Sequence, residues 1–258
     1  MTGQITTRQV GRTLWITLDR PEARNAMTLA MYDALAAACA GVPDDGAIGA
    51  VVIHGAGGKA FAAGTDMTEF RGFSSPQDAL DYEARMAGVM AAIETCAVPT
   101  IAALNGACTG GGAVIAATCD IRITSASLKF GVPIARTLGN CLSAANLARL
   151  TSLLGAGRVR ELIFTARLMG AEDALATGLV TEVLPDEPAL MARAKALADH
   201  VGAMAPLTLR ATAEAMRRNR EAATVDDHDL VTACYMSADF KNGLEAFLTK
   251  QKPVWTGK

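Results

Sequence analysis

The chain has 258 residues, of which 24 are lysine or arginine and 26 are aspartate or glutamate, so its formal charge is −2. This length suits one large α/β domain, or a core domain with a small helical appendage, and either can bury a substantial core. Because the charges are spread without long blocks, the composition argues against binding to nucleic acid or to an anionic membrane. A small-molecule ligand is the better expectation.

The cysteines form no CxxC pair and have no histidine at metal-ligand spacing, so we expect reduced, mostly buried thiols and no metal site. The first residues, MTGQITTRQVGR, lack the apolar core and cleavage pattern of an export signal, which makes the cytoplasm the expected location. An uncharged stretch from Val98 to Cys119 is long enough to cross a bilayer. Pro99, the Asn105-Gly106 turn and the glycines that follow predict instead a strand, a loop and a buried helix.

Segments 5–10 and 11–18 are rich in β-branched and aromatic residues and predict a hairpin. Short apolar runs closed by turns, which are typical of strands covered on both faces, follow at 50–54 and 100–104, and a further short strand is expected at 121–124. Apolar residues at helical spacing predict helices at 28–40, 76–95, 143–154, 158–164 and 171–177. Strands and helices therefore alternate through most of the chain, which indicates an α/β fold.

The last part of the chain has a different pattern. From Glu187 to Lys250 it is helical throughout, with breaks at Pro206 and near Asn219 and no run typical of a strand. We therefore expect an α/β core in residues 1–186 and a helical region in residues 187–258 that caps the core or forms a subunit interface.

Two glycine-bearing segments follow two of the buried strands, FAAGTDM at 61–67 and NGACTGGG at 105–112. Where such a turn opens a helix, the first N–H groups lack partners and lie at the positive end of the helix dipole. Two such donors from separate turns can converge on one carbonyl oxygen and favour an enolate-like transition state. Tight packing of helices on a sheet also requires glycine and is the alternative interpretation.

The order and spacing of the motifs along the chain favour the first interpretation. The motifs are DRPEARNAM at 19–27, AFAAGTDM at 60–67, the glycine run at 105–112, CDIR at 119–122, FGVP at 130–133, ATGLV at 176–180 and DFKNGLEAF at 239–247. In this order, which extends over nearly the whole chain, they resemble the signatures of the crotonase (enoyl-CoA hydratase/isomerase) superfamily.

This resemblance implies a crotonase-like spiral core of ββα units with a C-terminal helical trimerisation region, and assembly as a homotrimer or a dimer of trimers. It also implies an enzyme of fatty acid metabolism, a hydratase (lyase) or an isomerase, that acts on an acyl-CoA. Coenzyme A would be part of the substrate thioester, and no separate cofactor is expected.

By position, the resemblance implies that the backbone N–H groups of Thr65 and Gly111 form an oxyanion hole. The residues implied to contact substrate are Ala63, Asp66 and Met67 beside the thioester, Ala23 and Arg24 beside the CoA nucleotide, and Lys250 and Lys252 near its phosphates. The two lysines are as easily explained as a solvated helix end.

The sequence departs from the family at the two positions where hydratases carry glutamates that position and ionise water. Val114 and Ile134 stand there, and Ala135, one position later, is no better. Aliphatic side chains cannot transfer protons, and such acid–base groups typically contribute roughly a hundred- to ten-thousand-fold in rate. Ordinary enoyl-CoA hydration is therefore doubtful, and isomerisation, which often keeps the second glutamate, is weakened as well.

The polar segment 136–143 is the first place to look for a replacement. Arg136 could clamp an acyl carboxylate, Asn140 could hold a water, and Cys141 could carry a proton if its pKa were lowered. Loop capping or core packing is the more ordinary interpretation of each. Weaker candidates are Asp66, Glu69, Tyr82 and Glu83, and the histidines have no companion at a telling spacing.

Other motifs are incomplete. Gly55-x-Gly57-x-x-Ala60 superficially resembles a dinucleotide fingerprint but has no acidic residue ending a second strand, and GxSxG, Walker A and HExxH patterns do not occur. Two alternatives to a hydratase or isomerase stay open, namely a thioester hydrolase and a catalytically idle acyl-CoA-binding protein. Side chains of Arg136, Asn140 or Cys141 that pointed into the acyl pocket would favour the enzyme.

Overall fold

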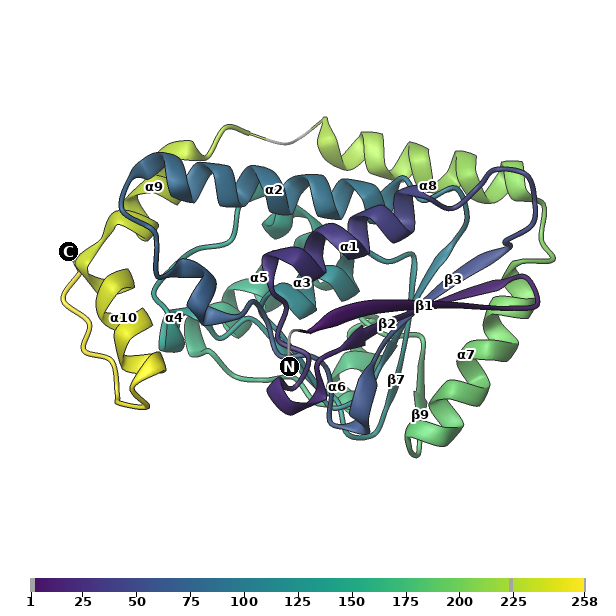
Figure 1. Ribbon diagram of the computed structural model, residues 1–258, viewed down its shortest axis with the longest axis horizontal. Helices are drawn as coiled ribbons and strands as arrows, with labels where there is room; N and C mark the ends of the chain where they lie inside the picture. Colours follow the sequence, from purple (N-terminus) through teal and green to yellow (C-terminus); the bar gives the residue numbers. More distant parts are fainter. Residues whose placement is uncertain (1–2, 223–224, 258) are drawn as a thin grey trace.

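The computed structural model describes residues 3–222 and 225–257 (Figure 1). Its main element is a six-stranded sheet with the strand order β1-β2-β3-β5-β7-β9, in which β1 and β2 are antiparallel and all other neighbours are parallel. The predicted hairpin and the predicted strands at 50–54, 100–104 and 121–124 are confirmed, whereas β9 was not expected. The strands are β1 (Gln4–Val10), β2 (Thr13–Asp19), β3 (Ala50–Gly55), β5 (Thr100–Leu104), β7 (Ile121–Ser125) and β9 (Glu182–Leu184).

A second, three-stranded parallel sheet consists of β4 (Ala60–Ala62), β6 (Ala107–Thr109) and β8 (Lys129–Gly131). Each of these strands directly follows a strand of the large sheet and precedes a helix, so the chain repeats a ββα order three times. None of the three was predicted, because three residues are too few to display a period. Both glycine-bearing segments lie at the ends of these short strands, where the site is built.

Helices cover both faces of the large sheet (Figure 1). Alternate side chains of a strand point to opposite faces. Accordingly Val51 and Ile53 of β3 join the main core, whereas Ala50 and Val52 pack with helix α7. The helices of the central part are α1 (Leu29–Ala40), α2 (Pro76–Glu94), α3 (Gly111–Thr118), α4 (Ile134–Thr137), α5 (Ala144–Thr165, with a break at Gly155) and α6 (Ala171–Ala176).

The last third is helical as predicted, with α7 (Glu187–Val201), α8 (Pro206–Glu221), α9 (His228–Met236) and α10 (Ala238–Leu248). Its helices have different neighbours. Helix α7 packs on the sheet and so extends the core beyond residue 186, while α9 and α10 lie at the other end of the molecule against α2 and the 3-10 helix Met67–Phe70 (Figure 1). Helix α8 runs through Asn219 without a break. A trimerisation role for this region stays a prediction.

The uncharged stretch between Val98 and Cys119 contains β5, β6 and α3. Among the described helices, none combines the length and the apolar character needed to span a bilayer.

Candidate active site

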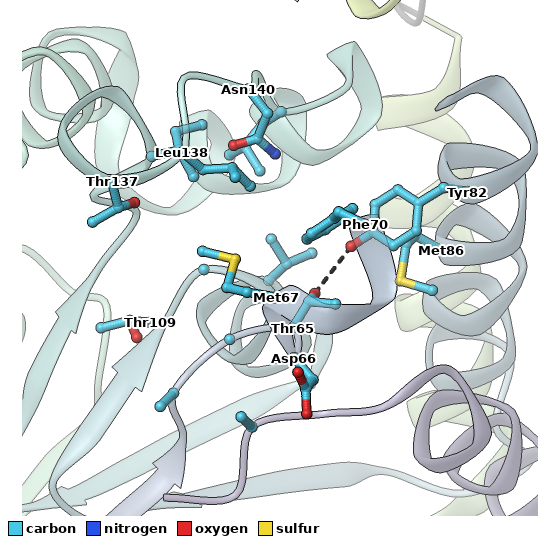
Figure 2. Close-up of a pocket in the computed structure, with 18 of the residues that line it drawn as sticks. Thr65, Asp66, Met67, Phe70, Tyr82, Met86, Thr109, Thr137, Leu138 and Asn140 are labelled. Carbon is cyan, nitrogen blue, oxygen red and sulfur yellow. Dashed lines mark hydrogen bonds between the residues drawn. The ribbon is translucent and has the colours of Figure 1, made fainter. Parts of the chain in front are cut away.

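A cavity of about 500 Å³ lies between α2, the start of α3, the segment around α4 and the helices α9 and α10. Figure 2 shows Thr65, Asp66 and Met67 on one side of it and Thr137, Leu138 and Asn140 on the other. Both glycine-bearing segments line this cavity. The elements that were expected to form the site therefore meet there.

The first turn is fixed from both sides of Thr65. Met27 N–H donates to the Gly64 carbonyl at 2.8 Å, and Asp66 N–H donates to the Met27 carbonyl at 2.8 Å. Gly64 has φ +104°, a conformation that glycine adopts far more readily than other residues. Within the described residues the N–H of Thr65 itself has no acceptor, so it is free to donate to a ligand.

The second turn ends β6 and opens α3. Gly110 has φ +53° and ψ −124°, and its N–H donates to the Gly131 carbonyl at 3.0 Å. Gly111 is the first residue of α3, where an N–H has no partner within the helix, and no other acceptor for it occurs in the described parts of the chain. A β-carbon on Gly64 would lie 3.9 Å from the nitrogen of Gly111, so the two turns abut.

Three hydroxyl groups join at this end of the pocket. The side chain of Thr65 lies 2.9 Å from the Tyr32 hydroxyl and 3.0 Å from the Tyr82 hydroxyl (Figure 2 shows the second contact). Burial raises the pKa of Tyr32 to about 12 and the pKa of Tyr82 well above its ordinary value. Both phenols therefore stay protonated at neutral pH and hold the Thr65 side chain in place.

The cavity walls next to these turns are apolar at positions 114 and 134, where hydratases of the family carry glutamates. Val114, on the first part of α3, is 4% exposed, and Ile134 begins α4. Both residues line the cavity. Neither can exchange a proton with a ligand.

A chain of side-chain hydrogen bonds lies on the side of the pocket that α2 and α9 form. The Asn140 amide nitrogen donates to the Tyr235 hydroxyl at 3.1 Å, and this hydroxyl donates to Glu83 Oε1 at 2.9 Å. Burial raises the pKa of the Glu83 carboxyl above its ordinary value, and hydrogen bonds from Tyr235 and Ser143 offset this only in part. Asn140 Oδ1 is buried and has no partner among the described residues.

A second carboxyl, that of Asp66, belongs to the opposite side. Arg20 donates to Asp66 Oδ2 at 2.6 Å, and Thr68 N–H donates to Oδ1 at 2.9 Å. Burial tends to raise the pKa of Asp66, but these hydrogen bonds outweigh it and hold the pKa below its ordinary value. Asp66 is thus an ionised residue that caps the 3-10 helix and pairs with Arg20.

Most of the residues expected to contact substrate do line the cavity. They are Ala23, Arg24, Ala63, Asp66, Met67, Asn140 and Cys141. Arg136, Lys250 and Lys252 do not: all three are exposed and none borders the cavity. The expectation that Arg136 clamps an acyl carboxylate is therefore wrong for this arrangement, because α4 turns Ile134 and Thr137 toward the cavity and leaves Arg136 on the solvent side.

Cys141 borders the cavity, but the pKa of its thiol is shifted upward, whereas a proton carrier would need a lowered pKa. A hydrogen bond with Cys234, together with burial, raises the pKa of the Cys141 thiol. The thiol therefore stays neutral at neutral pH. A role in proton transfer is not supported by this geometry.

Tyr32 and Tyr235 are pocket residues that the sequence did not reveal, and Glu83 was expected only as a minor candidate. Tyr32 lies on α1, Glu83 on α2 and Tyr235 on α9. A polar residue within an otherwise apolar helix face is the only local signal that they share. Their meeting in one cavity depends on tertiary packing, which no spacing in the sequence encodes.

Comparison with known proteins fits this arrangement. A family model described as enoyl-CoA hydratase/isomerase matches residues 10–258. The chain belongs to the enoyl-CoA hydratase/isomerase family. This family consists of enzymes, lyases or isomerases, and the superfamily resemblance inferred from the motifs is confirmed.

Known proteins are similar to this chain over most of their length. A short-chain-enoyl-CoA hydratase of Clostridium acetobutylicum is 32% identical over 94% of this chain and 93% of its own. A solved methylmalonyl-CoA decarboxylase in complex with 2-nitronate-propionyl-CoA is 26% identical, with a TM-score of 0.89 over 99% of each chain. An enoyl-CoA hydratase/isomerase of Pseudoalteromonas atlantica T6c is 27% identical, with a TM-score of 0.83 over 98% of this chain and 100% of its own.

Proposed function

We propose that this family member binds an acyl-CoA and stabilises a thioester enolate with the backbone N–H groups of Thr65 and Gly111. The observation that carries the proposal is the pair of abutting turns, each with an N–H that has no acceptor among the described residues and each facing the same cavity. Preorganised donors of this kind favour the charged oxygen of an enolate over the neutral carbonyl. Relatives named as crotonyl-CoA hydratase and methylmalonyl-CoA decarboxylase support an acyl-CoA as the substrate.

The CoA part of the substrate is proposed to enter past Ala23 and Arg24, which border the cavity on the N-terminal side of the Thr65 turn. Arg20 is already paired with Asp66, so Arg24 is the cation at this border that is better placed to meet a phosphate. Lys250 and Lys252 are exposed on the last residues of the chain and are proposed as weaker electrostatic contacts.

Proton transfer needs a group other than the residues at positions 114 and 134. Two carboxyl groups, those of Asp66 and Glu83, line the described part of the cavity. Asp66 has a lowered pKa and two strong partners. The pKa of Glu83 is raised and therefore lies closer to neutral pH, which suits proton transfer. We therefore propose Glu83 as the acid–base group of the pocket.

Two changes at Gly111 test the oxyanion hole. A β-carbon at this position would lie 2.0 Å from the Tyr32 hydroxyl oxygen, so both variants are made in a Tyr32→Phe background that removes this atom. Gly111→Ala keeps the N–H, whereas Gly111→Pro removes it at the first helical position, where proline is tolerated. We expect the proline variant to exchange the substrate's α-proton about a hundred- to a thousand-fold more slowly than the alanine variant.

The measurement is incubation with crotonyl-CoA and with butyryl-CoA in D₂O, followed by mass spectrometry for deuterium and by absorbance for loss of the enoyl group. Release of free CoA thiol would instead support the thioester hydrolase. Binding without exchange, hydration or hydrolysis would support the idle binding protein and would contradict the proposed enzyme. Equal rates in the alanine and proline variants would remove Gly111 from the mechanism.

Assembly as a homotrimer or a dimer of trimers is part of the proposal. Helix α8 has no buried residues, and Leu207 and Met216 on it are 75% and 69% exposed. Such side chains are better accommodated against another copy than in water. Light scattering on the purified protein should give three or six times the mass of the chain, and a monomer would contradict this part of the proposal.

A further inference from the structure

The segment that follows α4 lies along helix α9. The Ala144 N–H donates to a carboxylate oxygen of Asp227, the residue just before the first residue of α9. The Asn140 amide nitrogen donates to the hydroxyl of Tyr235, about two turns further along the same helix, at 3.1 Å. Residues 141–143 are therefore held against α9 by contacts on both sides of them.

Two cysteines meet where this segment crosses the helix. Cys141 Sγ lies 3.9 Å from the Leu230 carbonyl oxygen. Cys234 is four positions after Leu230 in α9, so it lies one turn further along the same face. The thiols of Cys141 and Cys234 are in hydrogen-bond contact, and both side chains are partly exposed. A disulfide places its sulfur atoms about 2.05 Å apart, so these two thiols need only a short approach to form one.

The two thiols differ in reactivity. The hydrogen bond with Cys141 lowers the pKa of the Cys234 thiol to about 7, although burial opposes this shift. The same contact raises the pKa of the Cys141 thiol. At neutral pH about half of Cys234 is therefore thiolate, the nucleophilic form, and it has a second thiol beside it. Burial instead raises the pKa of each of the other cysteines, which are Cys39, Cys96, Cys108 and Cys119.

We propose that Cys234 and Cys141 form a redox-active pair that hydroperoxides convert into a disulfide. The Cys234 thiolate attacks the outer oxygen of the hydroperoxide, the O–O bond breaks, and the leaving oxygen takes up a proton as an alcohol or water. The Cys141 thiol then attacks the sulfenic acid on Cys234, and water leaves as the S–S bond forms. The two sulfur atoms together give up the two electrons that reduce the O–O bond.

The disulfide joins α9 to the segment that lines the cavity. Cys141 borders the cavity together with its neighbours Asn140 and Leu142, so oxidation fixes this part of the cavity wall to the helix. Because the two cysteines are far apart in the sequence, the cross-link also closes a long loop, which stabilises the folded chain. This inference goes beyond the proposed function and does not depend on which ligand the cavity binds.

Mass spectrometry of the full chain tests the inference. The reduced protein is treated with a slight excess of hydrogen peroxide at neutral pH and is then unfolded in the presence of iodoacetamide. We expect four of the six thiols to be alkylated, a peptide pair joined through Cys141 and Cys234, and full alkylation after dithiothreitol. The midpoint of urea denaturation should rise by about 1 M on oxidation. Amide hydrogen exchange in α9 and residues 139–143 should slow.

A protein that formed no disulfide, or one between other cysteines, would overturn the inference. Oxidation of Cys234 to a sulfenic or sulfinic acid without a bond to Cys141 would do the same. A disulfide that left hydrogen exchange in α9 unchanged would contradict the proposed fixing of the cavity wall.

Variants assign the role of each thiol. Cys234→Ser should form no disulfide, whereas Cys141→Ser should stop at a sulfenic acid on Cys234 that dimedone traps. Cys96→Ser is the matched control, because Cys96 is also partly exposed but has a raised pKa, and it should form the disulfide as the unaltered protein does. In the folded, reduced protein Cys234 should react with iodoacetamide at least about fivefold faster than Cys96. Equal rates, or a disulfide lost in Cys96→Ser, would contradict the assignment of Cys234 as the attacking thiol.

Discussion

At the end of the pocket near Thr65 and Gly111 the groups available to a ligand are backbone N–H groups, whereas at the end near Asn140 they are side-chain atoms. The first end is made by two turns that β4 and β6 place next to each other. The second is made by α2, the segment after α4 and α9, which are far apart in sequence. This difference implies that the backbone geometry of the fold forms the carbonyl-binding end. Individual side chains form the surface that meets the rest of the acyl group.

The largest effect should come from Glu83. In Glu83→Gln the amide keeps the shape and a hydrogen-bonding oxygen for Tyr235 but cannot transfer a proton, so α-proton exchange in D₂O should fall by about a hundred- to ten-thousand-fold. Affinity for butyryl-CoA should stay within a few-fold, since the backbone end is untouched. Asp81→Asn, an exposed change on the same helix, is the control and should leave exchange unchanged. Undiminished exchange in Glu83→Gln would show that the side-chain end supplies no proton.

Tyr235 should follow in size, through stability more than chemistry. Tyr235→Phe leaves the Asn140 amide nitrogen and Glu83 Oε1 without their shared partner, which should lower the free energy of unfolding by roughly 1–3 kcal/mol. Urea denaturation measures this loss. In the double variant Tyr235→Phe/Asn140→Leu the loss should be smaller than the sum of the single effects, because both remove the same hydrogen bond. Additive losses would show that Asn140 and Tyr235 do not depend on one another.

The same contrast explains how much could be predicted from the sequence. A turn after each of two buried strands was predicted because glycine motifs are local signals, whereas Thr65 and Gly111 were singled out only by the resemblance to the family. The Tyr235–Glu83 contact joins residues 152 positions apart, and the Asn140–Tyr235 contact spans 95 positions, so no local pattern announces either one. Arg136 was misplaced for a related reason: the four residues of α4 are too few to reveal which face of the helix is buried.

A pH effect on stability should be next in size. The pKa of Glu83 is raised in the folded chain, so the folded form keeps this proton at a pH where the unfolded chain, with a pKa near 4.5, has released it. The contribution of neutral Glu83 is therefore fully present below that value and is lost as the pH rises toward the folded pKa. Compared with Glu83→Gln, which has no such proton, the unaltered protein should lose stability as the pH rises from about 4 to about 7. Parallel urea midpoints for the two proteins over this range would contradict a raised pKa.

The smallest effect on activity should come from the side chain of Thr65, although Thr65 lies at the centre of the proposed oxyanion hole. Thr65→Val keeps the backbone N–H and the branched shape and removes the hydroxyl that Tyr32 and Tyr82 share. Stability should fall by about 1–2 kcal/mol, because two buried phenols lose a partner. Exchange of the α-proton should slow by less than about tenfold, well below the loss in Gly111→Pro, since the donor to the oxygen is retained. A loss in Thr65→Val as large as that in Gly111→Pro would mean that the Thr65 hydroxyl takes part in the chemistry. The division between a backbone end and a side-chain end of the pocket would then have to be abandoned.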